Sequence, residues 1–134
     1  MEAQEISVDA KTDDNSFPEN SFIRQWCSNQ EAAAQKMGIS LWLTGEEIKE
    51  HMEAAGFQNV EIRSYKIPIG PWPAEKKLKE VGLFQLAGML EGMEGLTLGL
   101  WTRYLGWSEK EIAVTLAQVR KEWRNPKVHS WWPL

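Results

Sequence analysis

Residues 44–73 read TGEEIKEHMEAAGFQNVEIRSYKIPIGPWP, and this stretch decides the fold. Thr44 followed three residues later by Glu47 is a capping box, in which each side chain binds the backbone amide of the other residue. The box predicts an amphipathic helix over residues 46–55 that stops at Gly56. The apolar stripe of this helix consists of Ile48, Met52 and Ala55.

Apolar and charged residues alternate after the turn. Val60 and Ile62 alternate with Glu61 and Arg63, a pattern of period two that predicts a strand over residues 59–69. Proline has no amide to donate to a sheet, so the three prolines between residues 68 and 73 end the strand.

Two more helices have clear start and stop signals. Ser21 can cap a helix over residues 22–37, which Gly38 ends. A second capping box opens a helix at residue 108, and Asn125-Pro126 stops it.

The region from residue 74 to residue 105 is apolar and predicted to be helical. Its glycines lower helix propensity but allow another element to approach closely, and a break is expected near residues 92–95. Gln85, Glu91 and Glu94 interrupt the apolar run, which argues against a membrane span. With short strands at 2–10 and 127–134, the expected order is strand, helix, helix, strand, helix, helix, strand.

Composition narrows the class of protein. A chain of 134 residues with 43% hydrophobic and 25% charged residues is typical of one globular domain. The net charge of −4 gives no general attraction for nucleic acid. A single cysteine excludes an intrachain disulfide, and the acidic N-terminal segment lacks the apolar core of a signal peptide, so we expect a cytoplasmic protein.

Three phrases, GFQNVEIRSYKIPIGPWP, KKLKEVGLFQLAGMLEGMEGLTLGLWTRYLGWS and VRKEWRNPKVHSWWPL, resemble the C-terminal part of the LaeA-like methyltransferases of fungal secondary metabolism. Those methyltransferases have a class I fold with strand order 3-2-1-4-5-7-6. The resemblance implies an α+β or truncated α/β fold, with about three strands resembling strands 5, 7 and 6 and about four helices. Residues 1–134 would then form a single truncated methyltransferase-like domain, in which residues 1–20 are a partly ordered edge strand and loop.

The resemblance begins near the fifth strand, beyond the glycine-rich loop that holds S-adenosylmethionine in the family. The chain has no G-x-G cluster after a hydrophobic strand, so we expect no cofactor and no cofactor-binding residue. Without the first four strands, the strand at residues 2–10 would have an open edge. Open edges pair with other chains, which predicts a homodimer or a partner that supplies the absent half.

The resemblance also indicates where a substrate would bind. In the family, two regions border the acceptor-substrate pocket: the end of the apolar helix, here residues 74–105, and the proline-containing segment after the strand, here residues 68–73. The chain has eight tryptophans, and large aromatic side chains either fill a core or line an apolar site. The residues expected to bind substrate are Tyr65, Trp72, Trp101, Tyr104, Trp131 and Trp132.

Three residues are candidates for catalysis. His129 lies in an aromatic-rich strand, where a near-neutral imidazole can move a proton; its alternative role is hydrogen bonding at a sheet edge. Glu91 interrupts an apolar surface and could be a pocket carboxylate or a residue that simply reaches solvent. Arg103 follows the apolar helix, in the pocket region.

Other reactive groups are given structural roles. Cys27 lies on the apolar side of its helix and is expected to be a small buried thiol. His51 and His129 lack the spacing of metal ligands, so no metal site is expected.

These observations lead to two functional hypotheses. In the first, the chain is a cofactor-independent enzyme that binds a hydrophobic polyketide-like or terpenoid-like molecule and catalyses its cyclisation or isomerisation by positioning it. In the second, it is a non-catalytic methyltransferase remnant or subunit that acts through dimerisation or a partner chain. Methylation by the chain alone is not expected.

Overall fold

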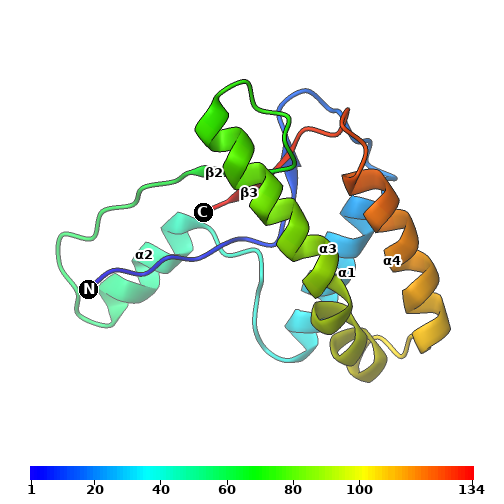
Figure 1. Ribbon diagram of the computed structural model, residues 1–134. Coiled ribbons are helices and arrows are strands. Elements are labelled where there is room, and N and C mark those ends of the chain that lie inside the picture. Colours follow the sequence, from blue (N-terminus) through cyan, green and yellow to red (C-terminus); the bar gives the residue numbers. More distant parts are fainter.

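The computed structural model describes residues 1–134 and contains a three-stranded antiparallel sheet in the order β1-β3-β2 (Figure 1). The strands are β1 (Lys11–Thr12), β2 (Lys66–Ile69) and β3 (Ser130–Pro133). Because β3 pairs with both neighbours, the strand that comes last in the sequence lies in the middle. This order is consistent with strands 5, 7 and 6 of a class I methyltransferase sheet.

Four helices accompany the sheet: α1 (Phe22–Lys36), α2 (Gly45–Ala54), α3 (Lys76–Tyr104) and α4 (Glu109–Trp123). The expected α+β class and the expected order of strands and helices are confirmed. None of the helices combines the length and apolarity needed to cross a lipid bilayer.

The predicted caps are present. Thr44 N–H donates to Glu47 Oε2 at 2.7 Å, and Glu47 N–H donates to Thr44 Oγ1 at 3.2 Å. Ser108 and Glu111 form the same reciprocal pair at 2.8 and 3.3 Å. Ser21 caps α1 by accepting from the Arg24 amide. Local sequence is sufficient here because all partners of a cap lie within one turn.

The first strand is shorter and later than predicted. A strand over residues 2–10 is wrong, since pairing with β3 is limited to Lys11 and Thr12. The Ser7 amide donates to Pro133 O, but the next amide, from Val8, donates to Leu41 O in the loop before α2. Residues 7 and 8 therefore bond to two different neighbours with single hydrogen bonds, and no continuous ladder forms.

The second strand is also shorter than predicted. Only Lys66–Ile69 of the expected 59–69 forms a ladder, extended by Tyr65, whose backbone exchanges hydrogen bonds of 2.8 and 2.9 Å with Leu134. No residue of β3 lies opposite residues 59–64, so their alternating pattern has no strand to pair with.

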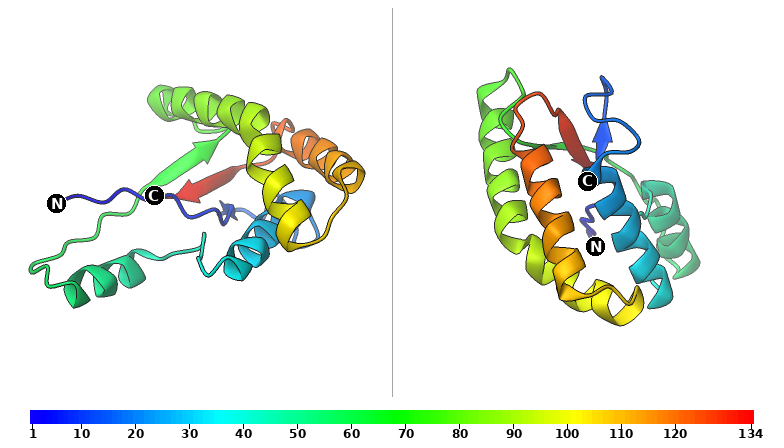
Figure 2. Two further views of the ribbon diagram at one scale, coloured as in Figure 1. Left: turned by 90° about the horizontal axis from the view of Figure 1, so that it is seen from below. Right: turned by 90° about the vertical axis from the view of Figure 1, so that its right-hand side faces the viewer.

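The long helix is continuous. The expected break near residues 92–95 is wrong, because α3 runs without interruption over 29 residues. Figure 2 shows that α3 instead changes direction about halfway along. A helical glycine costs only about 1 kcal/mol relative to alanine, which packing against α1 and α4 can offset.

One glycine of α3 is required by a close approach to β2. A Cβ atom at Gly82 would lie 2.0 Å from the carbonyl oxygen of Gly70, and the Gly70 amide donates to Gly82 O at 2.9 Å. The end of β2 is thereby joined to the first half of α3 through the backbone.

The core lies between α1, the second half of α3, α4 and one face of β3. Trp26, Trp123 and Trp132 meet there with ring centroids 5.5 to 6.5 Å apart. In contrast, α2 buries none of its residues, and Figure 1 shows it standing apart from the other helices.

Candidate functional site

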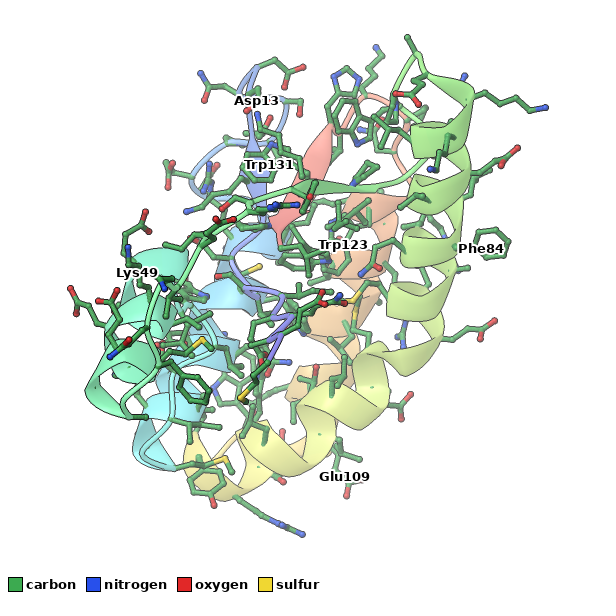
Figure 3. The ribbon with its side chains drawn as sticks, turned by 90° about the vertical axis from the view of Figure 1, so that its left-hand side faces the viewer. Asp13, Lys49, Phe84, Glu109, Trp123 and Trp131 are labelled. Carbon is green, nitrogen blue, oxygen red and sulfur yellow. The ribbon has the colours of Figure 1, made fainter.

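The face of the sheet opposite the core carries polar and aromatic side chains. Because side chains alternate along a strand, Trp131 points away from the face on which Trp132 packs against Trp123. In Figure 3, Trp131 and Asp13 lie together beside β1 and β3, whereas Trp123 lies at the end of α4. Lys66 Nζ lies 4.5 Å above the Trp131 ring and contacts both carboxylate oxygens of Asp13 at 2.7 and 2.8 Å.

His129 and Asp14 form the second pair on this face. Their Nδ1 and Oδ2 atoms are 2.6 Å apart, although 115 positions separate them in the sequence. The His129 amide donates to Ser16 Oγ at 2.8 Å, so the loop between β1 and α1 fixes both the backbone and the ring of this histidine.

The Asp14 carboxylate is held in its charged form. Hydrogen bonds from Thr12 Oγ1 at 2.8 Å, from His129 and from Ser16 keep the pKa of Asp14 well below its usual range. An ionised carboxylate accepts a hydrogen bond from Nδ1–H, which leaves Nε2 as the imidazole nitrogen that is open to other partners. Nε2 has no hydrogen-bond partner within the chain.

Trp72 completes the surroundings of His129. The two rings stack with centroids 5.5 Å apart and an interplanar angle of 29°, and Trp72 Nε1–H donates to Ser130 O at 2.9 Å. The His129 side chain is nevertheless 40% exposed and that of Asp14 is 48% exposed. An imidazole that is oriented on one side and open on the other can accept and return a proton.

Sequence reasoning named three members of this cluster: Trp72, His129 and Trp131. It missed the residues that hold them, which are Thr12, Asp13, Asp14, Ser16 and Lys66. The available signal was the polar loop over residues 11–20, since acidic residues in a loop that follows a first strand can reach the start of the strand paired with it. What was lacking was the knowledge that β1 pairs with β3.

The other predicted site residues lie elsewhere. Trp101 and Trp132 are fully buried in the core, and Trp101 Nε1–H donates to Gln30 Oε1 at 2.8 Å. On α3, Glu91 and Arg103 are exposed, while Tyr104 is half-buried near its C-terminal end. None of these five side chains hydrogen-bonds to or stacks on His129, Asp14 or Trp72, so their assignment to one site stays a prediction.

Tyr65 lies at a groove beyond the far end of β3. The groove has a volume of about 940 Å³ and is bounded by α2, residues 57–65, the first residues of the chain and Pro133-Leu134. The predicted apolar stripe of α2 faces it through Ile48 and Met52. Further apolar lining comes from Trp42, Leu43, Phe57, Val60 and Ile62.

Cys27 is the buried thiol that was expected. It is 2% exposed, and burial raises its pKa to about 12, so the thiol is protonated and unreactive at neutral pH. No cluster of three or more histidine, cysteine, aspartate or glutamate side chains converges in a geometry that could hold a metal ion.

Comparison with known proteins identifies relatives of this chain. It is 32% identical to the probable methyltransferase tdiE of Emericella nidulans over 134 residues, which cover all of this chain and 42% of tdiE. It is 30% identical to the methyltransferase pytC of Aspergillus terreus over 130 residues, which cover 40% of that protein. It is 26% identical to the secondary metabolism regulator LAE1 of Cochliobolus heterostrophus, with 43% of LAE1 covered.

The chain is therefore homologous to fungal methyltransferases and LaeA-type regulators of secondary metabolism, and it spans about two fifths of the length of the curated relatives it matches. No family model and no solved structure matches it.

S-adenosylmethionine, which the methyltransferase relatives imply, does not fit the residues present. Gly70 is the only glycine that directly follows a strand, and its amide is already bound to Gly82 O. It is followed by Pro71 and Pro73, which have no amide to donate. A loop that cradles this kind of cofactor needs free amides at a helix N-terminus.

Proposed function

We propose that this chain is a cofactor-independent enzyme of fungal secondary metabolism that binds a hydrophobic polyketide-like or terpenoid-like molecule and isomerises or cyclises it by proton transfer. The observation that carries the proposal is the pair of His129 and Asp14, with Nδ1 held at 2.6 Å and Nε2 free. A carboxylate that orients an imidazole in this way is a recurrent arrangement for general acid–base chemistry.

The position of the groove supports an elongated apolar substrate. Alternate residues of β3 share a face, so Trp131 and Pro133 lie in one row, and His129, which directly precedes β3, stands two residues before Trp131. Four residues of extended strand span roughly 13 Å. A molecule with its apolar tail in the groove beside Pro133 can thus run along this row and present its reacting end to His129 when the flexible Lys66 side chain moves off the Trp131 ring.

The proposed step is a balanced proton shift. His129 Nε2 takes a proton from a carbon next to a carbonyl group, and the electron pair of the broken C–H bond moves into an enolate. The protonated imidazole then returns the proton to a different carbon of the same molecule, or the enolate carbon attacks a second carbonyl to close a ring and His129 protonates the resulting alkoxide. Neither route changes the oxidation state of the substrate as a whole.

A deuterium-exchange assay tests this function. Purified protein is incubated in D₂O with a panel of linear polyketide-type and terpenoid-type molecules that carry an enolisable carbonyl group, and both deuterium incorporation and product ratios are followed by NMR and mass spectrometry. We expect at least one substrate to exchange faster than in buffer. Rates and product ratios equal to buffer across the panel would remove the proposal.

Two variants separate catalysis from a general effect of histidine. His129→Gln is expected to lower the exchange rate by about 10²-fold or more, the size of a typical general-base contribution. His51→Gln removes the other histidine, which is exposed on α2, and is expected to leave the rate unchanged. Equal rates for both variants would rule out His129 as the proton carrier.

A second candidate function is favoured by the groove itself. Its apolar lining, together with the absence of buried residues in α2, suits an extended segment of a partner chain, so the chain could be a non-catalytic subunit. The edge predicted to be open, at residues 2–10, is partly occupied. The Val8 amide donates to Leu41 O, and Val8 O accepts from Trp42 Nε1–H at 3.0 Å. Ile62 lines the groove, so Ile62→Glu should weaken any assembly formed there. Loss of such an assembly in light scattering would support this alternative.

A further inference from the structure

The outward face of α3 carries an apolar patch that nothing in the chain covers. Phe84 is 79% exposed, and Figure 3 shows its ring pointing away from the rest of the molecule. Leu83 beside it is also exposed, as are Ala87 and Gly88 one turn further along. Burying a phenylalanine side chain stabilises a protein, and Phe84 gains little of this stabilisation within the chain.

The backbone of α3 is exposed beside this patch, because Gly88 has no side chain. A Cβ atom at Gly88 would meet nothing within 4 Å, in contrast to Gly82, which must be glycine because of Gly70. Glycine weakens an exposed helix relative to alanine, and nothing inside the chain requires it at position 88. A flat surface of this kind lets a large side chain of another helix lie close to the backbone.

The charges on the same face are arranged symmetrically about Phe84. Lys77 precedes it by seven residues and Glu91 follows it by seven, and seven residues make almost two whole turns, so all three share one face. Both charged side chains are exposed, and neither forms an ion pair within the chain.

This face is complementary to itself. If a second α3 lies antiparallel with Phe84 opposite Phe84, Lys77 of each copy lies opposite Glu91 of the other. In the same register Glu80 lies opposite Gly88, so no like charges meet. A two-fold axis uses the same patch on both subunits, so one favourable pair appears twice.

We propose that a second copy of this chain docks on α3, forming an antiparallel α3–α3 contact centred on Phe84 with reciprocal Lys77–Glu91 ion pairs. The contact is independent of the groove and of the His129 cluster, and it does not rest on the proton-transfer function.

Sedimentation equilibrium and light scattering test the contact. We expect the unmodified chain to be a dimer and Phe84→Glu to weaken its association at least tenfold. The matched control is Val114→Glu, since Val114 is a 60% exposed apolar residue on α4, and this variant should remain dimeric. Circular dichroism checks that both variants are folded. A monomeric unmodified chain at several hundred micromolar would overturn the proposal, and so would a Phe84→Glu dimer.

A charge-swap cycle tests the register. Lys77→Glu and Glu91→Lys each place like charges opposite one another twice, so each should weaken dimerisation several-fold, whereas the double variant should restore it. Failure of the double variant to recover would exclude the antiparallel register. A dimer dispersed by Ile62→Glu but not by Phe84→Glu would place the contact at the groove and refute this proposal.

Discussion

Asp14 Oδ2 lies 2.6 Å from His129 Nδ1, and this pair joins the first loop of the chain to the start of its last strand. The contact ties two segments together without burial, since both side chains are substantially exposed. Its contribution to stability consequently depends on the charge of Asp14.

The pH dependence of stability is expected to report this charge. Because the folded state lowers the pKa of Asp14 below its ordinary value of 3.8, the carboxylate stabilises the fold above that pH. The contribution is lost as pH falls below 3.8 towards the folded pKa. Urea unfolding of the unmodified chain and of Asp14→Asn between pH 2 and 7 should show a difference in stability near neutral pH that shrinks in acid. A difference that grows in acid would contradict this reading.

The two classes of glycine in α3 should respond oppositely to alanine. Gly82→Ala puts a methyl group 2.0 Å from Gly70 O, so we expect a loss of about 1 to 3 kcal/mol, as for overpacked sites. Gly99→Ala meets nothing within 4 Å and should gain up to about 1 kcal/mol from helix propensity. Denaturant unfolding measures both, and equal effects would mean that α3 does not approach β2 this closely.

The two capping boxes should differ in what their loss disturbs. Ser108→Ala should lower global stability by about 1 kcal/mol, since α4 packs into the core. Thr44→Ala should instead increase amide hydrogen exchange within α2 and leave global unfolding nearly unchanged, because α2 buries no residue. Exchange mass spectrometry with a denaturant titration separates the two. A global loss from Thr44→Ala would show that α2 unfolds together with the core.

A buried hydrogen bond between α1 and α3 provides another test. Trp26 Nε1–H donates to Thr97 Oγ1 at 2.9 Å, and Thr97→Val leaves this buried donor without a partner, at a cost of about 1 to 3 kcal/mol. Thr102→Val is the control. Both threonines donate a hydrogen bond to the backbone carbonyl four residues earlier, but Thr102 accepts none from a tryptophan. Similar unfolding free energies for the two variants would argue against the Trp26 bond.

Cys27 should react only when the fold opens. Its burial and its pKa, raised to about 12, predict slow modification by a thiol reagent at pH 8 and rapid modification in denaturant. The rate can be followed by absorbance with an aromatic disulfide. Fast modification of the native chain would show that α1 is not packed as described.

Short-range features of this fold could be predicted because their physics is local. The caps at Thr44 and Ser108 involve residues three positions apart, and the glycine stop at Gly56 depends on its own positive φ of 96°. The strand predictions failed in extent for the opposite reason. Alternation in residues 59–64 shows that a segment can pair, but pairing also requires a neighbour, which only the path of β3 supplies.

The sequence by itself determined the order of helices and strands, the capped helix starts and the relationship to fungal methyltransferases and regulators, because these follow from adjacent residues and from inherited phrases. Only the tertiary structure decided which tryptophans are buried, since Trp132 packs in the core while its neighbour Trp131 lies on the opposite face of the sheet. It also decided that Asp14 meets His129, because only the pairing of β1 with β3 brings residues 115 positions apart within hydrogen-bonding distance.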